Sequence, residues 1–363
     1  MKKKYITKVF LLFLLFTSST TFAQLNTPRG SQMATISQRV GITDISITYS
    51  RPSVNEREIW GALVPYGMNN LGFGTAKESP WRAGANENTT ITFANNITIE
   101  GKALAAGTYG LHMIVNEDGA ATVIFSNNST AWGSFFYEMS EDALRVDVSS
   151  NTISHTELLT YDFIDVKGDS ATVVLNWEKK QIPFKIEVDV TTIVLKDIRH
   201  KLQNTAGFGR QNWENAARFS LNNGGDLDEA LVWVNNAISG QFYSQKTFSN
   251  LALKGQILNK QGNTEEYTKL MDEASSMANM NQLNTLGYQL MAAKDFNKAL
   301  QYFKKNVKDN PENANVHDSL GECYKTMGDK KNAIKYLKKS LALNPPPNVK
   351  ANSERLLKEL ENL

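Results

Sequence analysis

Hydrophobic and polar residues alternate with a period of two along much of the first half of the chain. Ile45, Ile47 and Tyr49 alternate with serine and threonine residues, and Ile91 and Phe93 alternate with threonines. Successive side chains of a strand point to opposite faces, so each segment predicts a strand with one buried face. Further runs of this kind cover residues 111–115, 122–125, 161–166, 172–177 and 182–190.

Turn signals separate these predicted strands. The segment 116–119 ends in Asp-Gly and lies between two apolar runs, which is a strong hairpin signal. Residues 167–169 join the next pair of runs, and Tyr109 after Gly107 is typical of a tyrosine corner, whose hydroxyl bonds to the preceding backbone. Many short strands without helical periodicity predict an antiparallel β-sandwich, or a related antiparallel β fold, for residues 24–190.

The hydrophobic period changes after residue 190, and the sequence then repeats itself. Residues 280–313 align with residues 314–347 at a spacing of 34. The matched pairs are Leu286 with Leu320, Gly287 with Gly321, Ala299 with Ala333, Phe303 with Leu337 and Pro311 with Pro345. Glycine is needed where the two helices of a unit approach closely, and proline ends the second helix. The pattern resembles the tetratricopeptide repeat, which implies an α-solenoid that binds protein segments.

Weaker copies of the repeat precede the two clear ones, over residues 213–237 and 251–274. We therefore expect four helix pairs within residues 210–347, joined to the β domain by a helical linker at 191–209. Residues 348–363 are predicted to form an amphipathic capping helix, because a terminal repeat must present a polar outer face. The fold class expected is thus a two-domain β plus all-α chain.

The N-terminus has the pattern of a secretory signal peptide. Lys2, Lys3, Lys4 and Lys8 precede an apolar run over residues 9–16, which is followed by small residues ending at Ala23. We predict that residues 1–23 are removed by cleavage after Ala23 and that the mature protein is periplasmic or secreted. No later apolar run reaches the ~20 residues that a membrane-spanning helix needs.

Charge supports a boundary near residue 190. Residues 24–190 carry 12 basic and 19 acidic residues, a net charge of −7, whereas residues 191–363 carry 23 basic and 18 acidic residues, a net charge of +5. A change of sign where the hydrophobic period also changes indicates two domains. Nucleic acid is not expected as a partner of an exported protein. The single cysteine, Cys323, cannot form an intramolecular disulfide and is predicted to be a small buried hydrophobe.

The sequence contains no recognisable catalytic motif. The four histidines His112, His155, His200 and His317 lie 43, 45 and 117 residues apart, which is not a metal-ligand spacing. The G-x-S-x-G pattern of many serine hydrolases is absent from the sequence. We therefore predict a non-enzymatic protein that needs no cofactor or metal.

Five short motifs of the acidic domain resemble the domain of unknown function 2911 family of exported bacterial proteins. They are Tyr49–Val54, Ile59–Gly61, Leu63–Gly67, Trp81–Glu87 and Ala106–Tyr109. The resemblance covers roughly residues 28–190. It implies no particular activity, because none is assigned to that family.

The loops of the β domain contain an unusual density of aromatic and charged residues. Tryptophan offers a flat face for stacking, while arginine and glutamate make directional, charge-assisted bonds. A ligand site is therefore a candidate at Arg51, Trp60, Trp81, Arg82, Asn86 and Glu87. It leads to an alternative function, a protein that binds or acts on carbohydrate. The competing structural interpretation is that the tryptophans plug the end of the sandwich and Arg82 pairs with Glu87.

The solenoid offers a second candidate site in its groove. The tetratricopeptide resemblance places groove positions on Asn281, Asn284, Tyr288, Asn315, Asp318 and Glu322. Asparagine has both a hydrogen-bond donor and an acceptor, which suits an extended peptide backbone. We therefore predict a protein or peptide partner in this groove, and a solvated face without a ligand remains the alternative. Lysines that would clamp a C-terminal carboxylate are absent from these positions.

Overall fold

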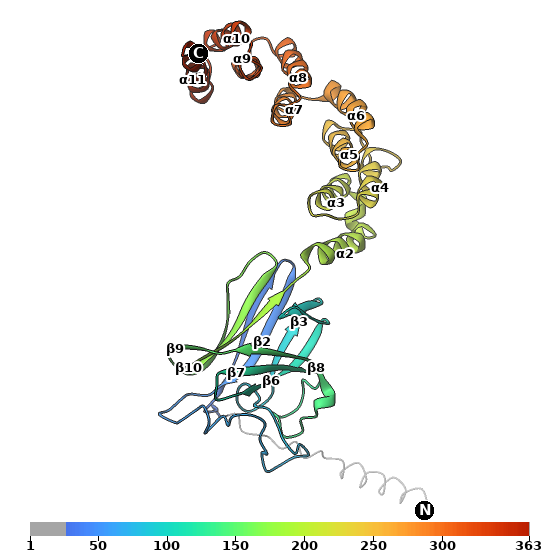
Figure 1. Ribbon diagram of the computed structural model, residues 1–363. Helices are drawn as coiled ribbons and strands as arrows, with labels where there is room; N and C mark the ends of the chain where they lie inside the picture. Colours follow the sequence, from blue (N-terminus) through green and yellow to red (C-terminus); the bar gives the residue numbers. More distant parts are fainter. Residues whose placement is uncertain (1–26, 363) are drawn as a thin grey trace, which may run out of the picture. The chain divides into compact units, whose positions relative to one another are not determined.

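The computed structural model describes residues 27–362 (Figure 1). Its internal contacts divide the chain into two compact units, with the boundary after Val190. The predicted signal peptide and its cleavage after Ala23 lie outside the described residues. Within residues 27–362, no helix combines the length and the apolar character needed to cross a membrane.

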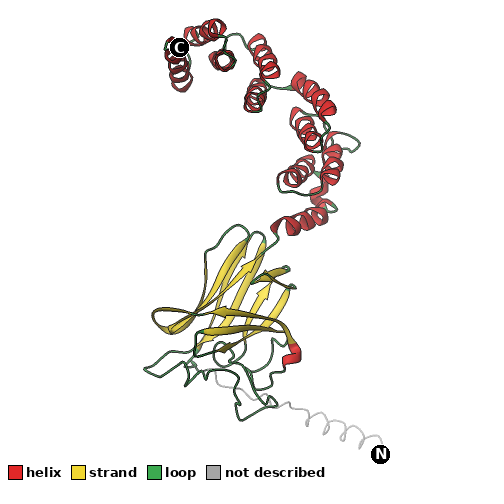
Figure 2. Ribbon diagram, in the orientation of Figure 1, coloured by secondary structure: helices red, strands yellow, loops and turns green. Residues whose placement is uncertain are grey.

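The first unit consists of two antiparallel sheets, drawn in yellow in Figure 2. The larger sheet has the strand order β1-β2-β3-β6-β7-β8, and the smaller sheet has the order β5-β4-β10-β9. The strands are Gln32–Val40 (β1), Thr43–Arg51 (β2), Thr89–Phe93 (β3), Ile97–Ile99 (β4), Lys102–Leu104 (β5), Gly107–Val115 (β6), Ala120–Ser126 (β7), Asp142–Ser149 (β8), Asn151–Ile164 (β9) and Ser170–Glu187 (β10). A short 3-10 helix, Met139–Glu141 (η1), precedes β8.

The strand and turn predictions are confirmed where the sequence signals are strongest. In β2, Ile45 and Ile47 are fully buried while Ser46 between them is half-buried, as a period of two requires. The predicted hairpins join β6 to β7 and β9 to β10. The hydroxyl of Tyr109 donates to the carbonyl oxygen of Ala105 at 3.0 Å, which is the tyrosine corner.

One prediction about the strands is wrong. Residues 172–177 and 182–187 belong to a single strand, β10, which ends at Glu187, three residues before the predicted end. Its register against β9 shifts on both sides of Glu178, where the backbone has a φ of +54°. Such bulges bend a strand without ending it.

Buried aromatic side chains of the two sheets meet in the core. The rings of Phe125 (β7) and Phe184 (β10) lie 5.7 Å apart, and neither residue is exposed. Tyr49 of β2 packs against Tyr161 of β9 at 4.8 Å, and its hydroxyl accepts a hydrogen bond from the Tyr161 backbone N–H. These contacts bury apolar surface between the two sheets.

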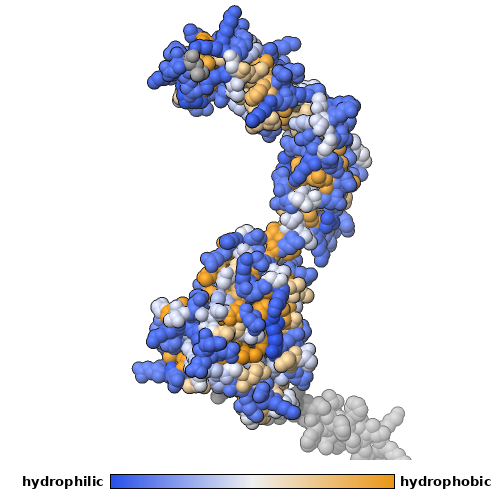
Figure 3. Space-filling view, in the orientation of Figure 1, coloured by the Kyte–Doolittle hydropathy of each residue, from blue (hydrophilic) through white to orange (hydrophobic). Residues whose placement is uncertain are grey.

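The second unit consists of helices, drawn in red in Figure 2. They are Val190–Leu202 (α2), Arg210–Asn222 (α3), Leu227–Ile238 (α4), Phe248–Lys260 (α5), Thr264–Met277 (α6), Met280–Ala292 (α7), Phe296–Asp309 (α8), Ala314–Thr326 (α9), Lys330–Ala342 (α10) and Pro347–Glu361 (α11), with a 3-10 turn at Thr205–Phe208 (η2). Helices α3 to α10 form four consecutive pairs, the arrangement of a tetratricopeptide solenoid. In Figure 3 this unit presents mainly hydrophilic side chains.

The repeat glycines lie where paired helices touch. A Cβ atom added to Gly287 of α7 would come within 2.4 Å of the Phe303 ring in α8. In the next pair, a Cβ on Gly321 of α9 would lie 2.7 Å from Cγ of Leu337 in α10. Both distances are shorter than van der Waals contact. The helices of a pair therefore approach so closely that only glycine fits.

Candidate functional site

The main candidate site is a hollow on the first helices of the solenoid. Figure 1 shows α3, α5, α7 and α9 along the inner side of the curved helical unit. A cavity of about 310 Å³ lies there, lined by residues of α5 and α7 and by Arg218 of α3. A capping box fixes the start of each of the two main helices, at Thr247 for α5 and at Asn279 for α7. The capping side chains bond to backbone N–H groups that would otherwise have no acceptor.

The hollow combines an apolar floor with a polar rim. The floor is formed by Phe248, Ala252, Leu253 and Leu286. On the rim, the side chains of Gln256, Asn281 and Gln289 form no hydrogen bond with another described residue, so their amide groups are available to a partner. Asn281 and Gln289 are exposed. Arg218, also exposed, is the charged residue among those lining the cavity.

Two of the predicted groove residues lie outside this hollow, on α7. The side-chain oxygen Oδ1 of Asn284 is buried and accepts no hydrogen bond from the described residues. The hydroxyl of Tyr288 donates to the carboxylate of Glu322, in the next first helix, at 2.9 Å. The Tyr288 ring packs edge-on against Phe303 at 5.3 Å, and burial raises the pKa of its hydroxyl. Tyr288 thus connects two repeats.

Asp318 is covered by the last helix and is not open to a partner. Only 3% of the residue is exposed, because α11 packs over this part of α9. Its carboxylate accepts hydrogen bonds from Nδ2 of Asn352 at 2.8 Å and from the Ser353 hydroxyl. Burial raises the pKa of Asp318. Asn315, one turn earlier, is half-buried at the start of α9, where its backbone N–H donates to the capping side chain of Asn313.

The groove positions therefore do not form one continuous site. Asn281 lines the hollow, and Asp318 belongs to the joint between α9 and α11. The structure adds Ser249, Gln256, Gln289 and Arg218, which sequence reasoning missed. The only available signal was the repeat pattern of residues 213–237 and 251–274, which is too weak to assign groove positions in α3 and α5.

The tryptophans of the β domain pack against one another. Trp60 meets Trp81 edge to face, with ring centroids 5.7 Å apart and planes at 88°. Trp81 stacks on Trp177 at 5.9 Å and 15°, and Trp177 is only 1% exposed. A sugar-binding platform would need the Trp60 and Trp81 rings side by side on an open cleft. Their perpendicular arrangement agrees instead with the interpretation of an aromatic plug.

Two polar residues of the predicted ligand site bond within the domain. The guanidinium of Arg51 donates to the Leu159 carbonyl at 3.0 Å and to the Thr160 hydroxyl at 2.6 Å, which fastens β2 to β9. The side-chain amide of Asn86 donates to the Ser31 carbonyl at 3.1 Å. Neither Arg51 nor Asn86 is among the described residues that line a cavity here.

The expected pairing of Arg82 with Glu87 is wrong. Glu87 forms its ion pair with Arg29, which lowers the pKa of the Glu87 carboxyl. Arg82 donates to the backbone carbonyl of Asn86 at 2.6 Å, and its guanidinium lies 4.8 Å from the centre of the Phe135 ring. The positive φ of Asn86, +60°, turns the chain so that its carbonyl reaches Arg82. Arg82 and Trp81 both line a second cavity.

Two of the histidines, His112 and His317, and the cysteine Cys323 are buried within the fold. His112 is buried, with Nδ1 3.0 Å from the Ser134 hydroxyl, and burial lowers its pKa to about 4. Burial raises the pKa of Cys323 to about 11, so the thiol stays protonated at neutral pH. Nε2 of His317 lies 2.7 Å from the Pro311 carbonyl oxygen. Among residues 27–362, no group of three or more His, Cys, Asp or Glu side chains could hold a metal ion.

The fold and these sites define a two-domain protein in which an antiparallel β domain precedes a solenoid of helix pairs. Residues 31–186 match the family described as "Protein of unknown function (DUF2911)", and residues 290–353 match a tetratricopeptide repeat. Both resemblances expected from the sequence are confirmed, in the expected order. No curated protein matches the chain.

Several solved structures are similar to part of the chain. MamA is 13% identical, with a TM-score of 0.31, and the match covers 43% of this chain and 89% of that one. YrrB, described as a TPR protein with an unusual peptide-binding site, is 14% identical over 46% and 84% of the two chains, with a TM-score of 0.30. PilF of Pseudomonas aeruginosa is 21% identical over 44% and 72%, with a TM-score of 0.31. The tetratricopeptide repeats support a protein-interaction scaffold as the broad class of function.

Proposed function

We propose that this protein is an exported, non-enzymatic binding protein whose solenoid holds an extended segment of a partner protein in the hollow between α5 and α7. The observation that carries the proposal is the lining of this hollow. Gln256, Asn281 and Gln289 present unpaired amide groups beside an apolar floor. A solvated face that served only for solubility would have no need of a cavity with such a floor.

The lining matches the chemistry of a peptide in extended form. Each amide side chain can donate to a backbone carbonyl and accept from a backbone N–H of the bound segment. The floor around Phe248 and Leu286 would receive an apolar side chain of that segment, which removes apolar surface from water. The backbone contacts would supply general affinity, and the apolar contact would favour particular sequences.

The test begins by identifying a partner in cells. A photo-crosslinking amino acid at Gln289 would capture whatever protein occupies the hollow, and mass spectrometry would name it. The affinity of the purified partner is then measured for the Asn281→Ala/Gln289→Ala double variant. Loss of one hydrogen bond at each position costs about 0.5–1.5 kcal/mol, so we expect affinity to fall about tenfold.

The chain offers a matched control on a second helix. Asn297 and Gln301 of α8 are exposed, have the same side chains and make no hydrogen bond through them with another described residue. The Asn297→Ala/Gln301→Ala variant should therefore bind like the unaltered protein. Equal affinities for the two double variants would contradict the proposed site. Alanine favours helix formation, so neither change should unfold the solenoid.

Export is a separate part of the proposal and has its own test. It is supported by the lysine-rich start, the apolar run over residues 9–16 and the small residues ending at Ala23. Mass spectrometry of the protein outside the inner membrane should find Gln24 at its N-terminus. An exported protein that still began at Met1 would contradict cleavage, and retention of the full-length chain in the cytoplasm would contradict export.

A further inference from the structure

The β domain contains a cavity whose described lining has positive charge and no acidic residue to balance it. It has a volume of about 300 Å³ and lies among the loops that follow β2 and precede β3. Much of its wall is apolar, formed by Leu63, Leu71, Pro80, Trp81 and Trp177. Among the described residues that line it, the charged ones are Arg57 and Arg82, and none is acidic.

Arg82 is a half-buried cation without a carboxylate partner. Its bonds are the contact with the Asn86 carbonyl at 2.6 Å and the stacking on Phe135, and no carboxylate among the described residues forms an ion pair with it. Burial lowers the pKa of Arg82, which reports the cost of holding this charge away from water. Buried charges in proteins are normally paired. A bound anion would supply the missing partner.

The backbone at Gly133 packs closely against the Arg82 guanidinium. Gly133 passes over it with a φ of +66°, and a Cβ at that position would lie 2.3 Å from Cζ of Arg82. A side chain at residue 133 would displace the guanidinium. Glycine at this position therefore lets the chain keep Arg82 in place at the cavity wall.

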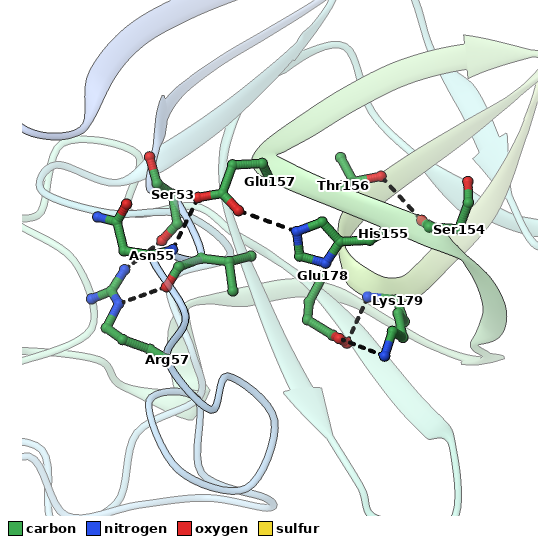
Figure 4. A network of polar contacts seen from close by, with 10 residues as sticks. Ser53, Asn55, Arg57, Ser154, His155, Thr156, Glu157, Glu178 and Lys179 are labelled. Carbon is green, nitrogen blue, oxygen red and sulfur yellow. Dashed lines mark hydrogen bonds and ion pairs between the residues drawn. The ribbon is translucent and has the colours of Figure 1, made fainter.

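Arg57 adds a second cation whose bonds are also to neutral groups. Its guanidinium donates to the backbone carbonyls of Val54, at 3.0 Å, and Ser53 (Figure 4). The nearby carboxylate of Glu157 instead accepts from the Asn55 backbone N–H at 2.9 Å and contacts His155 at 3.1 Å. The charge of Arg57 is therefore also not neutralised by an ion pair among the described residues.

Trp177, which also lines the cavity, has a polar group that is unpaired in the part of the chain that the structure describes. It lines the same cavity, is only 1% exposed, and its indole N–H is buried without a hydrogen-bond acceptor among the described residues. A buried donor that has no acceptor costs about 1–3 kcal/mol. Native proteins rarely leave such a group unpaired.

We propose that this cavity binds a small organic carboxylate with a flat, apolar body. The guanidinium groups of Arg57 and Arg82 would face the carboxylate, because a planar guanidinium matches a carboxylate in geometry as well as charge. The apolar body would lie against Trp81 and the neighbouring leucine and proline side chains. The volume is at the lower end of the range for small-molecule sites, roughly 300–1,000 Å³. This site is independent of the solenoid and of its protein partner.

The first test compares two probes that differ in charge. Isothermal titration of the full mature chain with 2-naphthoate should show saturable binding, and 2-naphthamide, which has the same ring system without the charge, should bind at least tenfold more weakly. Arg82→Gln should weaken the binding of 2-naphthoate at least tenfold. The control Arg39→Gln alters an exposed arginine of β1 that pairs with Asp44, and it should leave binding unchanged. Absence of saturable binding, or equal binding of acid and amide, would overturn the proposal.

A second measurement locates the probe without any substitution, in case Arg82→Gln does not fold. The indole N–H groups of the six tryptophans give separate NMR signals. Addition of 2-naphthoate should shift the signals of Trp81 and Trp177, and Trp233, buried in the solenoid, should not respond. Shifts confined to other tryptophans would place the probe elsewhere and would overturn the assignment of this cavity.

Discussion

The close helix contact at Gly287 predicts that an alanine at this position destabilises the protein. A Cβ atom added at this position would lie 2.4, 2.5 and 2.8 Å from three ring carbons of Phe303. Phe303 is fully buried, so its ring cannot move away without disturbing the pair α7 and α8. Overpacking of a core costs typically about 1–3 kcal/mol, and replacing a helical glycine by alanine returns about 1 kcal/mol of helix propensity. We expect Gly287→Ala to lower the free energy of unfolding by up to about 2 kcal/mol.

Gly255 in α5 serves as the matched control. An added Cβ there would lie 3.2 Å from Cδ2 of Tyr267, which is half-buried, and 3.3 Å from Sδ of Met271, whose unbranched side chain can change rotamer. Gly255→Ala should therefore lie between neutral and slightly stabilising. Urea midpoints followed by circular dichroism at 222 nm report mainly on the helices, and each variant is compared with the unaltered chain.

A double-mutant cycle separates the contact from other effects of alanine. Phe303→Leu shortens the side chain that Gly287→Ala would meet, so the second change should cost clearly less in the Phe303→Leu background. Equal midpoints for Gly287→Ala and Gly255→Ala, or strictly additive effects in the cycle, would refute the argument that close approach dictates glycine at this position.

Three further predictions concern single buried groups. Burial lowers the pKa of His112 from 6.5 to about 4, so the unfolded chain binds a proton at a higher pH than the folded protein does. As the pH falls from 6.5 to 4, about 3 kcal/mol of stability should therefore be lost, and urea titrations at several pH values should show that His112→Gln lacks this loss. Ser353→Ala removes a donor from the buried carboxylate of Asp318 and should cost about 1–3 kcal/mol, seen as faster hydrogen exchange in α11; unchanged exchange would contradict the contact. Tyr109→Phe removes the bond to Ala105 and should lower the unfolding free energy of the β domain by about 1 kcal/mol, whereas an unchanged urea midpoint would count against a stabilising tyrosine corner.

Local sequence signals predicted the features that depend on local geometry. The Asp118-Gly119 step forms the hairpin between β6 and β7, where the Asn116 N–H donates to the Ala120 carbonyl at 2.9 Å and Gly119 has a φ of +91°. The 34-residue register predicted the close helix contacts at Gly287 and Gly321, because a repeat imposes the same contact in every unit.

Long-range pairing could not be predicted in the same way. Glu87 and Arg82 lie five residues apart, yet Glu87 pairs with Arg29, which reaches it through the fold. Likewise, nothing near Asp318 in the sequence shows that α11 will cover it. Asn352 follows Asp318 by 34 residues and bonds to it, so α11 takes the place that the first helix of another repeat would occupy. The repeat pattern ends before α11, although the packing continues.

The cavity of the β domain also shows why the net charge of a domain does not predict the charge of a site. The β domain carries a net charge of −7, which would disfavour an anionic ligand if charge were spread evenly. Its cavity nevertheless has two arginines and no acidic residue among its described lining. Carboxylates elsewhere in the domain, such as Glu87 and Glu157, bond to groups outside the cavity. The local excess of positive charge arises from how the Trp81–Glu87 segment turns, since the loop places Arg82 at the wall and directs Glu87 to Arg29. An acidic domain can thus hold a site for an anion.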